Sequence, residues 1–159
     1  FRTVRTQEGL AYSVGSYLRT GVRERGVWAM SAQTKLASTR DVVQLMIENM
    51  KRLREEAVTE EELEAAKEAF VNSFVFSFAH ASSIVSRLIS LEYDGLPKDY
   101  LEQLRDKVVK LTKEDLLEAA RRHLHPDRLM VLAVGPPKTL VDLLASFGEV
   151  EEVELEPER

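Results

Sequence analysis

The chain has 159 residues, of which 44% are hydrophobic and 31% are charged, a composition typical of one globular domain. Its formal net charge of −5 argues against a nucleic-acid-binding protein, because binding phosphate requires a surplus of cations. The absence of cysteine excludes disulfides and thiolate metal sites. No apolar run approaches the roughly 20 residues that span a bilayer. We expect a soluble protein with no membrane span, in the cytoplasm or the periplasm.

The first predicted element is a β-hairpin. Residues 10–19 alternate between larger and smaller side chains, a period of two that indicates a strand. The polar stretch T-G-V-R-E-R follows, and residues 26–34 then read as the returning strand. The pattern therefore predicts an antiparallel hairpin with Tyr12 near its start.

A series of helices is predicted next. Apolar residues recur at spacings of three and four after residue 38, which indicates an amphipathic helix of about five turns. Thr59 with Glu62, and Thr112 with Asp115, have the spacing of capping boxes that begin helices. The sequence D-G-L-P is a stop signal between two further helices. The expected helices cover residues 39–57, 60–78, 81–93, 98–109 and 113–124.

The C-terminal part predicts two strands around a short helix. Residues 128–135 (RLMVLAVG) are nearly all apolar, which favours a central strand covered on both faces. Residues 137–147 predict a helix, and residues 149–156 alternate weakly, as in a charged edge strand. We expect an α+β fold with two layers, a mostly antiparallel sheet with helices on one face. It would form a single domain over residues 1–156, followed by a frayed tail at residues 157–159.

The histidines do not form a recognisable metal motif. His80 stands alone, and His123 and His125 are two positions apart near a helix end, where they do not face each other. Cations at that position interact favourably with the helix dipole. The chain has neither H-E-x-x-H nor its inverted form, and it has no P-loop and no dinucleotide or nucleophile-elbow motif. We expect no metal ligands and no cofactor bound by this chain.

The opening stretch FRTVRTQEGLAYSV holds the candidate site residues. Arg5 carries a rigid set of donors suited to carboxylates and carbonyls, and Tyr12, seven residues later, carries a phenolic donor. Gly9 permits a backbone conformation that other residues resist. On pattern alone, Arg5 could equally form a surface ion pair and Tyr12 could simply occupy a strand position.

Three stretches carry a resemblance to a known family. The segment V-R-T-Q-E-G-L-A-Y-S-V resembles the signature in the second, C-terminal domain of the pitrilysin/insulinase family of zinc metallopeptidases, in its bacterial processing-peptidase-like branch. The stretch TEEELEAAKEAF and the long stretch from GLPKDYLEQ to VLAVGP resemble later segments of the same domain, in the same order. The resemblance implies a chain that begins inside such a domain and lacks its first strands and helix.

The resemblance also implies a mechanism. Zinc would be bound in the complete enzyme but outside this chain, in a first domain or a homologous subunit that also supplies the general base. This half would close over a peptide substrate. Tyr12 would donate a hydrogen bond to the oxyanion of the tetrahedral intermediate, and Arg5 would hold a substrate carbonyl. Both residues would thus be catalytic and substrate-binding, and the fragment alone would be inactive.

Two other functions stay open at this point. Some members of the family have lost the zinc motif and serve as structural or partner subunits, which is the main alternative to a metallopeptidase half. A free-standing α+β binding module, unrelated to peptidases, is the third possibility. The presence of both Arg5 and Tyr12 favours the peptidase half, because a scaffold does not need that pair.

Overall fold

The computed structural model describes residues 10–19, 26–76 and 80–153. These residues divide into two compact units. The first contains residues 10–19, 27–50 and 125–153, and the second contains residues 51–76 and 80–124.

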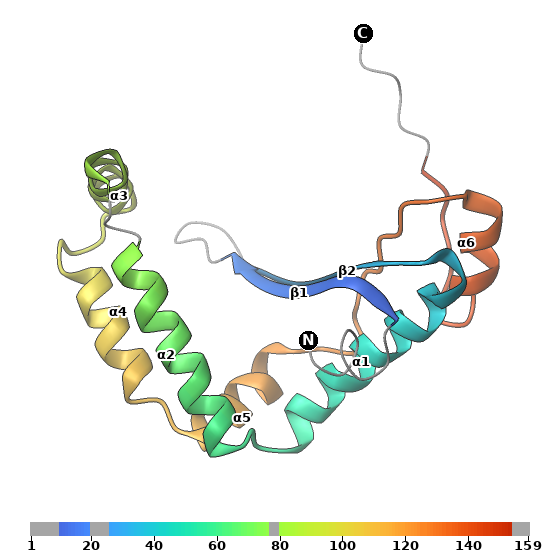
Figure 1. Cartoon of the computed structure of the whole chain (residues 1–159), viewed down its shortest axis with the longest axis horizontal. Coiled ribbons are helices and arrows are strands. Elements are labelled where there is room, and N and C mark those ends of the chain that lie inside the picture. Colours follow the sequence, from blue (N-terminus) through green and yellow to red (C-terminus); the bar gives the residue numbers. More distant parts are fainter. Residues whose placement is uncertain (1–9, 20–25, 77–79, 154–159) are drawn as a thin grey trace, which may run out of the picture. The chain divides into compact units, whose positions relative to one another are not determined.

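The predicted hairpin is confirmed in the first unit. Strand β1 (Ala11–Arg19) pairs antiparallel with β2 (Val27–Thr34), and the register runs from Arg19 opposite Val27 to Ala11 opposite Thr34 (Figure 1). A short 3-10 helix, Leu36–Ser38, leads into helix α1 (Thr39–Glu55), as the apolar spacing predicts.

The hairpin is attached to α1 through a small apolar core. Ala11 of β1 and Val42 of α1 are 7% and 2% exposed and form its centre. The small alanine side chain allows the strand backbone to approach the helix closely. Further apolar residues of both strands and of α1 pack against this pair: Leu10, Val14, Ala32, Leu45 and Met46.

Helix α6 (Pro137–Leu144) completes the described elements of the first unit. Pro137 stands at its first position, where a missing N–H costs nothing. Leu140 and Leu144, one turn apart, are buried. Their spacing gives the helix one apolar face, which explains why so short a segment is helical.

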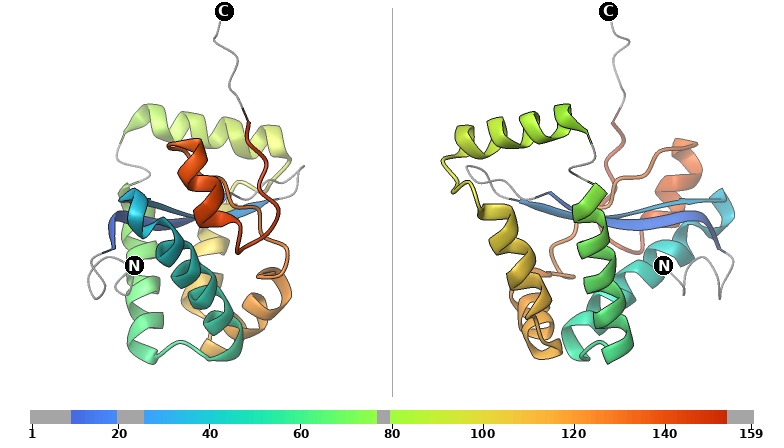
Figure 2. Two further views of the ribbon diagram at one scale, coloured as in Figure 1. Left: turned by 90° about the vertical axis from the view of Figure 1, so that its right-hand side faces the viewer. Right: turned by 60° about the vertical axis from the view of Figure 1, so that its left-hand side comes forward.

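The second unit contains the end of α1, from residue 51, and four further helices: α2 (Glu60–Phe76), α3 (Ala81–Asp94), α4 (Tyr100–Val109) and α5 (Lys113–His123). Helices α2 and α4 lie side by side (Figure 2). Arg105 of α4 stands over the ring of Phe74 of α2, with 5.8 Å between the guanidinium carbon and the ring centroid. A cation at this distance from an aromatic face is attracted by the ring quadrupole.

Both predicted capping boxes are confirmed. Thr59 donates its backbone N–H to the Glu62 carboxylate at 3.0 Å, and the Glu62 N–H donates to the Thr59 hydroxyl at 3.2 Å. Thr112 and Asp115 make the same pair of bonds at 2.8 and 3.2 Å at the start of α5. These reciprocal bonds satisfy donors that a helix N-terminus otherwise leaves open.

The predicted stop between α3 and α4 is also confirmed. Gly95 adopts a left-handed conformation with φ of 69°. Its N–H donates to the carbonyl of Glu92, and the N–H of Leu96 donates to that of Leu91, the bonds of a Schellman motif. A side chain at position 95 would be strained by this φ, so glycine is needed here.

The predicted central strand at residues 128–135 is wrong. Its residues form neither a strand nor a helix, although exposure still alternates along it. Met130, Leu132 and Val134 are 94%, 86% and 96% exposed, whereas Leu129 and Val131 are less than half exposed. A strand requires a neighbouring strand to satisfy its backbone groups, and none of the described residues supplies one here.

The predicted edge strand at residues 149–156 is wrong over residues 149–153, which have no regular structure. Its weak alternation, interrupted by glutamates, offers little apolar surface to hold a strand in place. Residues 154–159, including the predicted tail, lie outside the described residues, as do the predicted helical residues 77 and 78. The α+β class is confirmed, and the division into one domain and a tail stays a prediction.

The core contact predicts a contrast between two valines. Val42→Ala removes two buried methyl groups and should lower the free energy of unfolding by about 2 kcal/mol. Val27→Ala changes a 44% exposed residue of the same hairpin and should change stability by less than about 0.5 kcal/mol. Urea denaturation followed by circular dichroism measures both. Equal losses would show that the hairpin does not depend on its contact with α1.

The cap of α5 predicts a second contrast. Thr112→Ala should destabilise the protein by about 1 kcal/mol, because the N–H of Asp115 loses its acceptor. Thr139→Ala, an exposed threonine inside α6, is the control and should be neutral or slightly stabilising because alanine favours helix. Urea denaturation followed by circular dichroism measures the stability of both variants. A Thr112→Ala variant as stable as the control would contradict the role of the cap.

The cap also makes stability depend on pH. The backbone N–H and the hydroxyl of Thr112 donate to the Asp115 carboxylate and lower the pKa of Asp115. A lowered pKa stabilises the fold above the unfolded value of about 4, and this contribution is lost as pH falls through the folded value. Asp115→Asn should therefore lose less stability on acidification than the unsubstituted chain. Asp142→Asn in α6 is the control, and it should retain the full acid-induced loss.

Candidate functional site at the start of the hairpin

Tyr12 lies at a local irregularity of the hairpin. Ala11 pairs with Thr34 and Ser13 pairs with Gln33, so that Tyr12 between them has no partner on β2. This is the arrangement of a β-bulge, in which one strand carries an extra residue and the local twist increases. Bulges redirect side chains and are frequent next to functional sites. The bulge therefore sets the direction of the Tyr12 side chain.

The backbone is held immediately before this bulge. The Thr34 hydroxyl donates a short hydrogen bond to the carbonyl of Leu10. Ala11, the next residue, is buried against Val42 of α1. The strand thus has two anchors directly before Tyr12, one polar and one apolar. Such anchors restrict the positions that an exposed side chain can adopt.

The Tyr12 side chain itself is open to solvent. It is 83% exposed, and its hydroxyl makes no hydrogen bond within the part of the chain that the structure describes. A phenol can donate one hydrogen bond, and its ring can pack against apolar groups. An exposed, anchored tyrosine of this kind can therefore bind an extended backbone or an oxyanion.

Arg5, the other residue of the predicted pair, lies outside the described residues, as does Gly9. The seven-residue spacing of Arg5 and Tyr12 in the sequence stays the basis for pairing them. Sequence reasoning identified Tyr12 but did not foresee the bulge. The stretch L-A-Y-S-V carries no glycine or other bulge signal, so the extra residue becomes visible only from the register of the two strands.

The histidines do not combine into a metal site among the described residues. His80 immediately precedes α3, His123 lies in the last turn of α5, and His125 follows that helix. Within residues 10–19, 26–76 and 80–153, no three histidine or acidic side chains come close enough to hold a metal ion. These residues do not fit a zinc site. The binding of zinc outside this chain stays a prediction.

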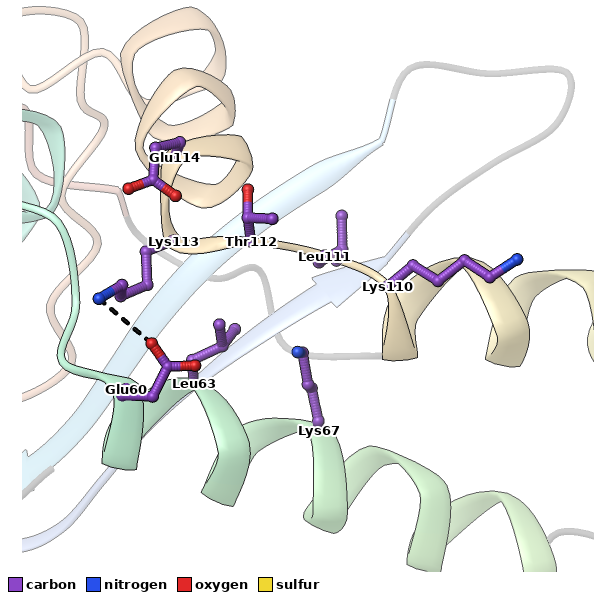
Figure 3. A pocket seen from close by; sticks show the side chains of 8 residues that line it. All are labelled: Glu60, Leu63, Lys67, Lys110, Leu111, Thr112, Lys113 and Glu114. Atoms are coloured by element: carbon purple, nitrogen blue, oxygen red, sulfur yellow. Dashed lines mark ion pairs between the residues drawn. The ribbon is translucent and has the colours of Figure 1, made fainter.

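A polar recess in the second unit has two of its three lining lysines in ion pairs. It has a volume of about 320 Å³ and lies between the start of α2 and the connection from α4 to α5 (Figure 3). Lys113 and Glu60 form an ion pair across it at 3.2 Å. Lys67, another lining residue, pairs with Glu64 at 2.8 Å. Both lysines thus have carboxylate partners within the helical unit, and we assign no ligand to this recess.

None of the described helices combines the length and the apolar character that crossing a membrane requires.

Three comparisons with known proteins agree. Residues 1–70 match the family described as peptidase M16 inactive domain. The chain is 28% identical over 136 residues to the non-peptidase homolog YmxG of Helicobacter pylori (strain ATCC 700392 / 26695), a match that covers 85% of this chain. The crystal structure of a peptidase M16 inactive domain from Pseudomonas fluorescens matches with a TM-score of 0.70 and 28% identity over 79% of this chain.

These matches cover 31% of the Helicobacter protein and 30% of the Pseudomonas chain, so the chain spans about a third of each relative. The structural match supports the α+β fold. The family resemblance of the opening segment and of the later helices is confirmed. The chain is therefore similar to the peptidase M16 inactive domain, over residues 1–70 in sequence and over 79% of its length in fold.

Proposed function

We propose that this chain is a non-catalytic M16 domain that uses the start of its hairpin to bind an extended peptide or the partner half of its own protein. It would not hydrolyse peptide bonds by itself. The observation that carries the proposal is the display of Tyr12, which projects from an anchored bulge and is 83% exposed. The ring and the hydroxyl of Tyr12 are therefore available for contact, while the anchored backbone limits the positions that they can adopt.

The names of the matched proteins support the non-catalytic part of the proposal. The matching family is described as an inactive domain, and the Helicobacter relative is a non-peptidase homolog. The sequence resemblance predicts the half of a metallopeptidase that assists catalysis, and the main alternative is a structural or partner subunit. The comparisons favour that alternative over the catalytic role.

A second candidate function rests on the same tyrosine. In a complete protein with a zinc-bearing half, the Tyr12 hydroxyl would donate to the oxyanion of the tetrahedral intermediate, and Arg5 would hold a substrate carbonyl. The anchored bulge favours this candidate, because a donor that is held in place before reaction is more effective than a mobile one. Removing such a donor costs roughly 100-fold or more in kcat in other enzymes.

The two candidates predict different results for Tyr12 variants of the complete protein. For a binding role, the ring matters more than the hydroxyl. Tyr12→Ala should then weaken binding of a labelled extended peptide or the partner half by about 10-fold, and Tyr12→Phe should bind nearly normally. No peptide cleavage should be detected. Fluorescence anisotropy measures binding, and a fluorogenic peptide measures cleavage.

For the catalytic role, the complete protein should cleave peptide, and Tyr12→Phe should lower kcat by roughly 100-fold with KM little changed. Tyr17→Phe is the matched control, because Tyr17 is another exposed tyrosine of β1. It should leave binding and turnover unchanged. Cleavage by the complete protein would overturn the non-catalytic proposal. A protein in which Tyr12→Ala changes neither binding nor turnover would exclude both roles for this residue.

A further inference from the structure

A second recess in the helical unit differs from the one in Figure 3 because none of its charged lining residues forms an ion pair among the described residues. It has a volume of about 570 Å³ and is lined by Lys51, Arg54, Glu55 and Arg121. Three of these four residues are cations, although the whole chain carries a net charge of −5. The recess lies between the last turns of α1 and of α5. The local charge is thus opposite in sign to that of the protein.

Arg54 contributes the most unusual group. Its Nε is buried and has no hydrogen-bond partner in the part of the chain that the structure describes. A buried N–H of a charged guanidinium without an acceptor is unfavourable, because the group has lost water and gained nothing in return. The Nε itself is closed to a molecule from outside, but Arg54 lines the recess, so an anion there would compensate the charge of the guanidinium.

The neighbouring cations are placed to act together with Arg54. Arg121 donates its Nε–H to the backbone carbonyl of Arg54 at 2.9 Å, which fixes the base of its guanidinium beside α1. That bond leaves the two terminal nitrogens of Arg121 as further donors. Lys51 precedes Arg54 by three residues and therefore lies on the same face of α1. The donors of two helices thus surround one recess.

The single carboxylate of the recess does not neutralise these cations. Among the described residues, no ion pair joins Glu55 to Lys51, Arg54 or Arg121. Cations near a helix C-terminus are favourable for the helix dipole, and this accounts for the charges of Arg52 and Arg54. It does not account for the buried Nε of Arg54 or for the approach of Arg121 from another helix.

We propose that this recess binds an anionic ligand through a carboxylate or phosphate group, held by Arg54 and Arg121 with Lys51 in support. A guanidinium presents parallel donors that match the oxygens of either group. The recess volume is in the range of small-molecule sites, so a molecule larger than the anionic group itself can be accommodated. This site is independent of Tyr12.

The test observes the Nε–H resonances of the arginines in the 159-residue chain by ¹⁵N–¹H NMR. Inorganic phosphate and glutarate are titrated separately at constant ionic strength. We expect the Arg54 resonance, assigned by its loss in Arg54→Gln, to shift saturably with at least one anion. Saturation by phosphate alone identifies a phosphoryl ligand, and saturation by glutarate alone identifies a carboxylate ligand. Saturation by both anions identifies a site that accepts either group.

Variants of the chain separate this site from general attraction of anions. Arg54→Gln, followed through the Nε–H resonance of Arg121, and Arg121→Gln, followed through that of Arg54, should each weaken binding by about 10-fold, as expected for the loss of a charge-assisted hydrogen bond. Glu55→Gln should strengthen it. Arg52→Gln removes the same charge from the same helix but does not line the recess, and it should change the Kd by less than about 2-fold. Arg121→Gln also covers the case in which Arg54→Gln fails to fold.

The proposal would be overturned by an Arg54 resonance that shifts with neither anion. It would equally be overturned if Arg52→Gln weakened binding as much as Arg54→Gln, because the effect would then be one of net charge and not of the recess.

Discussion

The contact between Ala11 and Val42 is the interaction on which the placement of Tyr12 depends. A two-stranded hairpin is marginally stable in water by itself, so its position must come from packing against another element. Ala11 provides that packing with the smallest side chain that still buries apolar surface, and Val42 meets it from α1. Because successive residues of a strand face opposite sides, a strand buried at Ala11 displays the next residue outward. The bulge at Tyr12 then adjusts the direction of that display.

The same hairpin is exposed over its far half. Tyr17 and Leu18 of β1 are more than half exposed, and their exposure does not follow a single face of the strand. The extended residues around Met130 and Leu132 are also uncovered and unpaired within the described residues. Both segments have the apolar composition of strands in a larger sheet. Neither segment is covered by other described residues, so both present apolar surface to solvent.

Local signals in the sequence predicted the elements that depend on near neighbours. The capping boxes at Thr59 and Thr112 and the glycine stop at Gly95 could be read directly, because each requires only contacts within a few residues. The strand predicted at residues 128–135 failed for the opposite reason. The apolar run is suited to a buried strand. Whether it forms one depends on pairing with residues distant in the chain.

The two candidate sites also show this difference between local signals and contacts of distant residues. Tyr12 was identified through the resemblance of its surrounding segment to a known family, while its bulge depends on the register of two strands and could not be read from L-A-Y-S-V. The recess at Arg54 had no sequence signal, because Arg54 and Arg121 are 67 residues apart and meet only through the packing of α1 and α5.

The proposed function makes Tyr12 the point at which this domain contacts a peptide or the other half of its protein. The most direct measurement replaces Tyr12 with a photo-crosslinking phenylalanine analogue in the complete protein and identifies the crosslinked residues by mass spectrometry. We expect crosslinks from position 12 to an extended peptide or to the partner half, and few from the same analogue at Tyr17. Crosslinks of equal yield from both positions, or none from position 12, would contradict it.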